Sequence, residues 1–112
     1  MPRRTKPDAL ALAIGLRIRA LREEAGLTQE KLAYTSELGS KGHLSSLEKG
    51  LVMPTVATLR SIADRLDVLV ADLVNDPTEN ERAKLLELTR SLPLEAVRRL
   101  IREASASKTR KR

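Results

Sequence analysis

Apolar side chains recur every three or four residues along most of this 112-residue chain, and this periodicity constrains its fold more than any other feature. Such spacing is typical of helices that bury one face. No stretch alternates between apolar and polar residues over a length that predicts a strand. Aromatic residues, which favour strands, are limited to one Tyr. The sequence therefore predicts an all-α protein with a core of Leu, Ile, Val and Ala.

Turn residues and capping residues divide this pattern into short helices. Five helices are expected before residue 76, over about residues 9–24, 29–38, 41–49, 56–66 and 70–74. The first four each follow a side chain that can cap a helix, namely Asp8, Thr28, Ser40 and Thr55. Gly39 suits the left-handed position that ends a helix, so a tight turn is expected between the second and third helices.

A second segment follows the Asn-Asp-Pro turn at residues 75–77. Thr78 and Glu81 fit a capping box that opens a sixth helix, and Pro93 separates this helix from a seventh. Both helices are amphipathic and too short to be stable alone in water, so their apolar faces must pack on something. We expect residues 76–105 to mediate homodimerisation. The apolar residues assigned to this contact are Leu85, Leu88, Leu92, Leu94, Val97, Leu100 and Ile101.

Positive charge is concentrated at the two ends of the chain. Residues 1–7 and 108–112 hold seven of the 21 basic residues and no acidic one, so the formal net charge of +6 becomes −1 for residues 8–107. The folded part must therefore gather basic side chains on one face if it binds a polyanion. We expect residues 1–7 to be a basic arm that could reach along such a polyanion, with a solubilising tail as the equal alternative. Residues 106–112 are expected to be a basic, disordered tail.

Several function classes lack their characteristic residues in this sequence. With no Cys and a single His, the chain offers neither disulfides nor a metal site, and we expect no cofactor. No nucleophile elbow or P-loop indicates an enzyme. The apolar run at residues 9–16 follows basic residues as in a signal peptide, but helical periodicity continues beyond it. No segment reaches the roughly 20 apolar residues of a membrane span, so we expect a cytoplasmic protein.

Two short helices joined by a tight turn, with helices on both sides, describe a helix-turn-helix, whose second helix enters the major groove of DNA. Over about residues 14–74, three stretches read IRALREEAGLTQEKLA, SxxxLSxLEKG and PTxxTLxxIAxxL. In this order they resemble the Cro/C1-type (XRE) helix-turn-helix family of bacterial and phage regulators. The resemblance implies a five-helix, lambda-repressor-like DNA-binding domain over residues 8–75, followed by a two-helix extension. It also implies a homodimeric repressor or autoregulator that binds double-stranded DNA.

The resemblance assigns the DNA-facing residues to the third helix and to the ends of its neighbours. It implies base contacts by Lys41, Gly42, His43 and Ser46. It implies contacts with the DNA backbone by Thr28, Gln29, Ser40, Ser45, Lys49 and Thr55. The alternative for these side chains is an ordinary solvated face, and for His43 it is a packing or capping role. Glycine costs a helix roughly 1 kcal/mol relative to alanine, but Gly42 would let the backbone approach the base edges.

The resemblance further implies a structural ion pair between Arg22 of the first helix and Glu48 at the end of the third. Such a pair would orient the recognition helix more than it would add stability. The alternative is two unrelated surface charges.

The sequence departs from the family pattern at two places. One extra residue precedes the third helix, so we expect the second helix to be one residue longer and to be capped by Gly39. Asp67 stands where the family commonly has a glycine after the fourth helix. Asp adopts the left-handed conformation less easily than Gly but more easily than most residues.

Two other functions compete with DNA-binding regulation. The GSKG stretch at residues 39–42 fits the GXXG loop of RNA-binding KH domains, but those domains need a sheet and the sequence predicts no strand. An antitoxin or protein-interaction adaptor with the same helix-turn-helix fold would use its last two helices to bind another protein. That role is compatible with DNA binding.

Overall fold

The structure is a computed structural model, which describes residues 6–36, 38 and 40–110. Within these residues it contains seven α-helices and no strand, as the sequence predicted. The chain divides into two compact units, residues 1–75 (unit 1) and residues 76–112 (unit 2). No helix in the described ranges is both long enough and apolar enough to span a membrane.

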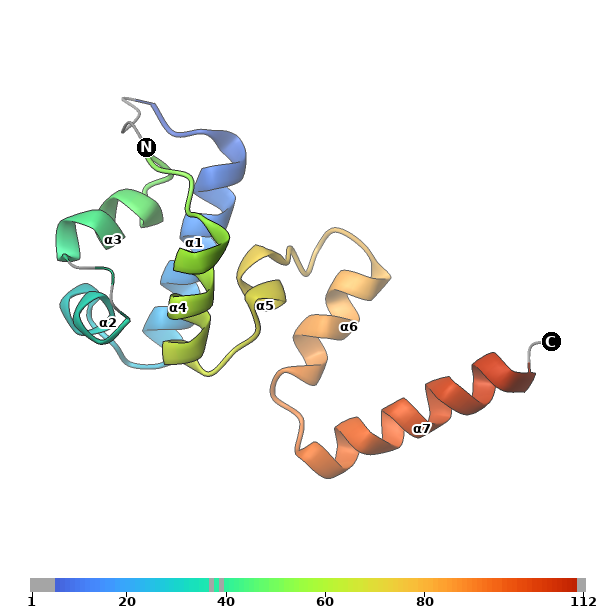
Figure 1. Cartoon of the computed structure of the whole chain (residues 1–112). Helices are drawn as coiled ribbons and strands as arrows, with labels where there is room; N and C mark the ends of the chain where they lie inside the picture. Colours follow the sequence, from blue (N-terminus) through green and yellow to red (C-terminus); the bar gives the residue numbers. More distant parts are fainter. Residues whose placement is uncertain (1–5, 37, 39, 111–112) are drawn as a thin grey trace. The chain divides into compact units, whose positions relative to one another are not determined.

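Unit 1 is a five-helix domain (Figure 1). Its helices are α1 (Ala9–Glu24), α2 (Gln29–Thr35), α3 (Lys41–Glu48), α4 (Val56–Leu66) and α5 (Val70–Val74). The first four begin at the predicted caps, because a side-chain oxygen of each capping residue accepts a backbone N–H three residues later. These bonds measure 3.0 or 3.1 Å and start from Asp8, Thr28, Ser40 and Thr55. Local capping chemistry thus sets where these helices start.

The core of unit 1 is aliphatic and draws on all five helices. Its largest fully buried side chains are Ile18, Leu32, Leu44, Leu47, Ile62 and Leu73. For α1 the apolar spacing in the sequence predicts one inward face made of Leu10, Ile14, Ile18, Leu21 and Ala25. In the structure the inward stripe contains Ala11 and not Leu10. Leu10 is 62% exposed and Ala11 is fully buried. Ala25, also predicted on this face, is exposed because it lies beyond the last turn of α1.

Two glycines let α1 lie directly against the end of α3. A Cβ on Gly15 would clash with the carbonyl oxygen of Leu47 and lie 2.8 Å from that of Glu48. Gly50 has φ +74°, and a Cβ there would lie 2.6 Å from the Cα of Leu12. Any larger residue at either position would push the two helices apart.

The connection between α2 and α3 differs from the prediction. α2 ends at Thr35, so it is shorter than expected, and the extra residue lies in the loop before Ser40. The hydroxyl groups of Thr35 and Ser36 donate to the carbonyl oxygens of Lys31 and Leu32, and such bonds compete with helix continuation. The capping role predicted for Gly39 falls outside the described residues.

The end of α4 is closed by a left-handed residue that is not glycine. Asp67 has φ 57° and ψ 45°, and its backbone N–H donates to the carbonyl oxygen of Asp64. The aspartate therefore adopts the conformation for which the family commonly has glycine.

Unit 2 contains α6 (Glu81–Thr89) and α7 (Leu94–Arg110). The capping box predicted at Thr78 and Glu81 is wrong, because Asn80 caps α6 by accepting the N–H of Ala83 over 2.9 Å. Thr78 instead donates its backbone N–H and its hydroxyl to Asp76, over 3.0 and 2.6 Å. These two bonds hold the pKa of the Asp76 carboxyl below its ordinary value.

α7 continues through residues 106–110, where the sequence predicted a disordered tail. No glycine or proline interrupts the chain after Pro93, and Ala, Lys and Arg are good helix formers. Basic residues near the helix C-terminus also interact favourably with the helix dipole. Composition alone therefore predicted too much disorder. Residues 111–112 lie outside the described part.

The close approach at Gly15 gives a prediction about stability. Gly15→Ala should lower the free energy of unfolding by about 1–3 kcal/mol, because the added methyl group meets backbone atoms that cannot easily move. Gly42→Ala is the matched control, since a Cβ there would meet no atom closer than 4.0 Å, and it should be neutral or stabilising by up to roughly 1 kcal/mol. Urea unfolding followed by circular dichroism measures both; equal midpoints would contradict the prediction.

Candidate nucleic-acid interface

α3 has an inner face that belongs to the core and an outer face that is nearly bare. Leu44 and Leu47 are fully buried, and Glu48 is 4% exposed. Gly42, Ser45 and Lys49 follow one another at helical spacing, so they share the outer face. Glu48, the only acidic residue of α3, is thus turned away from this face.

The predicted base-contacting residues do not all lie on that outer surface. Lys41, Gly42 and His43 are exposed in the first turn, and the backbone N–H of His43 donates to Ser40. Ser46 is only 4% exposed, so its assignment as a base contact needs correction. The chain after α3 turns back, and the N–H of Leu51 donates to the carbonyl oxygen of Ser46. Ser45, which is half-buried, is the serine nearer to solvent.

Glycine at position 42 is not required by the fold. Its φ is not positive, and a Cβ would find open space there. Gly42 therefore differs from Gly15 and Gly50, whose missing side chains leave room for neighbouring backbone. The open surface of α3 at Gly42 is available to an approaching ligand.

The residues predicted to touch the DNA backbone lie mostly at helix starts. Thr28, Ser40 and Thr55 are caps that keep some exposure to solvent, and Lys49 is exposed at the end of α3. The hydroxyl of Thr55 also donates to the hydroxyl of Thr58 over 3.0 Å, so its proton is used within α4. Four of the six predicted residues are thus accessible, and Ser45 is partly so.

Gln29 is engaged in a buried network. Its side-chain Nε2 donates to Oε1 of Glu48 over 2.9 Å. Arg22 donates to both oxygens of the same carboxylate, from Nε to Oε2 over 2.7 Å and from Nη2 to Oε1 over 3.1 Å. Glu48 therefore accepts three hydrogen bonds on the side of α3 that faces away from its outer face, and Gln29 helps to hold α3 in place.

The Arg22–Glu48 pair is buried, with side-chain exposures of 10% and 3%. The hydrogen bond to Glu48 raises the pKa of Arg22. Arg22 also donates from Nη1 to the carbonyl oxygen of Leu27 over 2.8 Å. One guanidinium thus connects α1, the turn before α2 and the end of α3.

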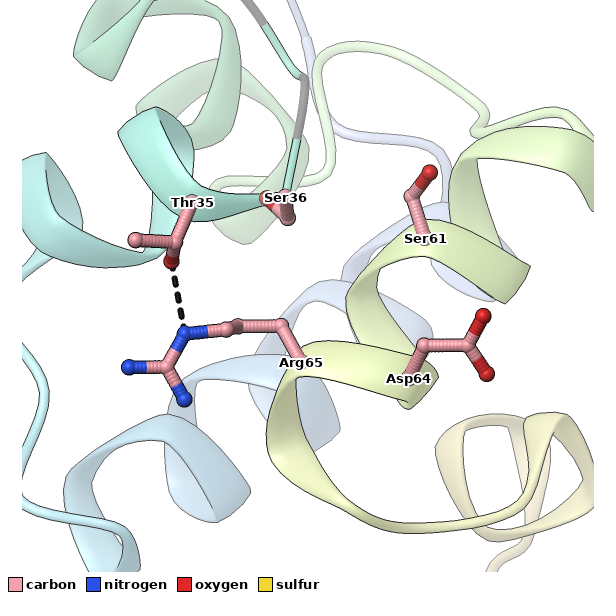
Figure 2. Close-up of a pocket in the computed structure, with 5 residues that line it drawn as sticks. All are labelled: Thr35, Ser36, Ser61, Asp64 and Arg65. Carbon is pink, nitrogen blue, oxygen red and sulfur yellow. Dashed lines mark hydrogen bonds between the residues drawn. The ribbon is translucent and has the colours of Figure 1, made fainter.

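The other end of α2 is held by a contact that the sequence did not reveal. Nε of Arg65 on α4 donates to Oγ1 of Thr35 over 2.7 Å. Figure 2 shows Arg65 reaching from α4 toward Thr35, beside a polar hollow that Ser36, Ser61 and Asp64 complete. The partners are 30 residues apart in the chain, and no local motif links them. α2 is therefore fixed to its neighbours at both ends.

The chemistry of the α3 surface suits an anionic ligand. Its exposed charged or titratable side chains are Lys41, His43 and Lys49, and its small residues leave backbone accessible between them. Among the residues that the structure describes, no cluster of three or more His, Cys, Asp or Glu residues could hold a metal ion. The surface offers hydrogen-bond donors and positive charge.

Comparison with protein families and curated proteins identifies proteins that share the helix-turn-helix arrangement of unit 1. The family described as "Helix-turn-helix domain" matches residues 13–75, more than half of the chain. The immunity repressor protein of Bacillus phage phi105 is 34% identical over 67 residues, which cover 60% of this chain and 46% of that protein. The uncharacterised HTH-type transcriptional regulator y4dJ of Sinorhizobium fredii is 44% identical over 66 residues, covering 59% of this chain and 83% of y4dJ.

Two solved structures are similar to this chain. The restriction-modification controller protein C.AhdI of Aeromonas hydrophila matches 59% of this chain and 98% of its own, with 30% identity and a TM-score of 0.57. A chain of the SinR protein/SinI protein complex matches 86% of this chain and 98% of its own, with 26% identity and a TM-score of 0.61. The second share is larger than unit 1, so this similarity extends into unit 2.

The Arg22–Glu48 pair gives a prediction that can be measured without DNA. Glu48→Leu alone should lower the free energy of unfolding by about 3–5 kcal/mol, because it leaves the Arg22 charge buried and unpaired. Adding Arg22→Met should recover part of this loss, which appears as coupling in a double-mutant cycle. The control cycle uses Arg19 and Glu23, an exposed pair at 3.3 Å, and should give less than about 1 kcal/mol of coupling. Strictly additive effects at Arg22 and Glu48 would contradict a structural role for the pair.

Proposed function

The chain belongs to the helix-turn-helix domain family, and we propose that it is a transcriptional regulator that binds a specific double-stranded DNA sequence. The observation that carries this proposal is the division of α3 into a buried face fixed through Glu48 and a bare outer face without acidic side chains. A helix held rigidly on one side and open on the other is suited to entering a groove. In this proposal the chain acts as a cytoplasmic repressor or autoregulator and has no enzymatic activity.

The outer surface of α3 fits the major groove in size and chemistry. The groove is about 12 Å wide, so Gly42 and Ser45 would allow the helix backbone to lie close to the base edges. Lys41 can donate to O6 and N7 of guanine, and His43 can donate to a base edge or a phosphate. Lys49, at the far end of α3, would contact the DNA backbone and fix the register.

Unit 2 supports a second part of the proposal, in which two copies of the chain associate. Its apolar side chains are poorly covered. Six of them are between 38% and 62% exposed, namely Leu85, Leu88, Leu92, Leu94, Leu100 and Ile101. Val97 is half-buried. A second copy would cover this surface and would place two α3 helices about one DNA turn, roughly 34–36 Å, apart.

A specific observation also favours a second candidate, the adaptor. The SinR protein/SinI protein complex, whose similarity extends into unit 2, joins two different proteins. The apolar residues of unit 2 would then bind a different partner chain. DNA binding by α3 is compatible with this alternative, so the two candidates differ in what covers unit 2.

Selection of bound sequences from random duplex DNA tests the main function. We expect the full chain to enrich one motif with two-fold symmetry and half-sites about one helical turn apart. Gly42→Leu should weaken binding to that motif by about tenfold or more while leaving the helical circular dichroism unchanged, because its side chain would hold α3 away from the bases. Gly42→Ala is the smaller matched change and should weaken binding less. No enrichment by the wild-type chain at moderate salt would contradict DNA recognition.

Light scattering tests the association through unit 2. The wild-type chain should be a dimer at micromolar concentration, and Ile101→Asp should be a monomer, because it places a charge within the apolar surface. Ala106→Asp adds the same charge on another side of α7 and should remain a dimer. A monomeric wild type, both free and on DNA, would contradict homodimerisation.

A further inference from the structure

The positive charge of the folded chain is concentrated on α7, which Figure 1 shows as one continuous helix. Residues 94–110 hold five basic and two acidic residues, a formal net charge of +3. Residues 6–93, which include the candidate DNA surface, hold 12 basic and 13 acidic residues, a net charge of −1. A polyanion is attracted to the surface on which positive charge is gathered. Among the described helices, α7 is therefore the one that attracts a polyanion most strongly.

Three arginines make up the basic side of α7. Arg98, Arg99 and Arg102 are exposed, and none of them forms an ion pair or a side-chain hydrogen bond with another residue that the structure describes. Arg102 lies four residues after Arg98 and three after Arg99, so like charges are neighbours on the helix surface. Such neighbours destabilise a helix. Nothing within the described chain offsets this repulsion, whereas an anionic partner would.

The apolar side of α7 helps to identify that partner. At 3.6 residues per turn, Arg99 and Arg102 lie opposite the side formed by Val97, Leu100, Ile101 and Ala104. A lipid surface would have to take up this apolar side, and the chain has no Trp or Phe with which to enter it. A second copy of the chain, as proposed above, would instead cover the apolar side. The arginines would then remain open to a partner that makes polar contacts alone, and a nucleic-acid backbone is such a partner.

We propose that the basic side of α7, formed by Arg98, Arg99 and Arg102, binds the phosphate backbone of duplex DNA and is a second DNA-binding element besides α3. This inference rests on the proposed function, which supplies DNA as the polyanion. A guanidinium group can donate two parallel hydrogen bonds to one phosphate. Phosphate contacts add affinity without reading bases. The basic side of α7 should therefore strengthen binding to every sequence by the same factor, while α3 retains the choice of sequence.

Salt titration of binding to duplex DNA that lacks the selected motif tests the proposal, because such DNA is bound through its phosphates. Arg98→Gln with Arg102→Gln removes two charges from α7, and Gln keeps a similar helix propensity. This variant should reduce the slope of log affinity against log salt concentration by about 0.9 for each phosphate that α7 no longer neutralises. Arg99→Gln, directed away from the apolar side, is a second variant and should reduce the slope by up to about 0.9.

The matched control removes the same number of charges from unit 1. Arg19→Gln with Arg60→Gln changes exposed arginines that each contact an acid of their own helix, over 3.3 and 3.1 Å, and should keep the wild-type slope. Light scattering should find the wild-type oligomeric state in all three variants, because the apolar side of α7 is intact in each.

Two results would overturn the proposal. The first is a wild-type slope in both α7 variants. The second is an equal loss of slope in the control, which would show that the total charge matters rather than its place on α7. If vesicles of phosphatidylglycerol bind the wild type but not the α7 variants, and the DNA slope is unchanged, the partner is a lipid surface instead. A wild-type chain that enriches no motif would overturn the proposed function, while its slope on unrelated DNA still reports on α7, so the two failures are distinguishable.

Discussion

The carboxylate of Glu48 is the point on which the candidate DNA surface depends. It is buried at the end of α3 and accepts two hydrogen bonds from Arg22 and one from Gln29. Because Arg22 also binds the carbonyl oxygen of Leu27, the same group fixes the turn between α1 and α2. A buried ion pair contributes little net stability when its desolvation is counted, but its geometry is strict. Its main effect is to give α3 one orientation.

The close packing around this network reinforces that orientation. Gly15 allows the backbone of α1 to touch the carbonyl groups at the end of α3, and Gly50 allows the chain to turn beside Leu12. At the opposite end of α2, Arg65 binds Thr35 from α4. Polar contacts and the two glycines thus act together to position the helix-turn-helix. The aliphatic core supplies the burial of apolar surface that drives folding.

Features that depend on local chemistry were predictable from the sequence. The caps at Asp8, Thr28, Ser40 and Thr55 form because their hydroxyl and carboxylate oxygens bond within three residues. The helical periodicity in turn predicted the five helices of unit 1. The pairing of Arg22 with Glu48 came from a family resemblance, since nothing local joins positions 26 residues apart.

The errors arise where distant or competing interactions decide. Ser46 is buried although helical spacing places it near Gly42 and Lys49, and the chain after α3 turns back so that the N–H of Leu51 donates to its carbonyl oxygen. Thr78 had two possible partners, and the short bond to Asp76 left the capping position to Asn80. At the end of α7 the polar composition of residues 106–110 indicated disorder, whereas their helix propensity favoured continuation of the helix. The sequence alone does not say which of the two effects is larger. The contact of Arg65 with Thr35 links residues that no motif connects.

The separation of the two faces of α3 has a consequence for how such a protein can diverge. Within the described residues, the polar side-chain bonds that hold the helix in place use Glu48 or the capping hydroxyl of Ser40. On the outer side, Gly42 has no side chain and the side chain of Ser45 makes none of these bonds. On the proposed function, substitutions on the outer surface would therefore change the preferred DNA sequence with little loss of fold. A duplicated copy would be able to acquire a new target through one or two changes while its scaffold stays the same.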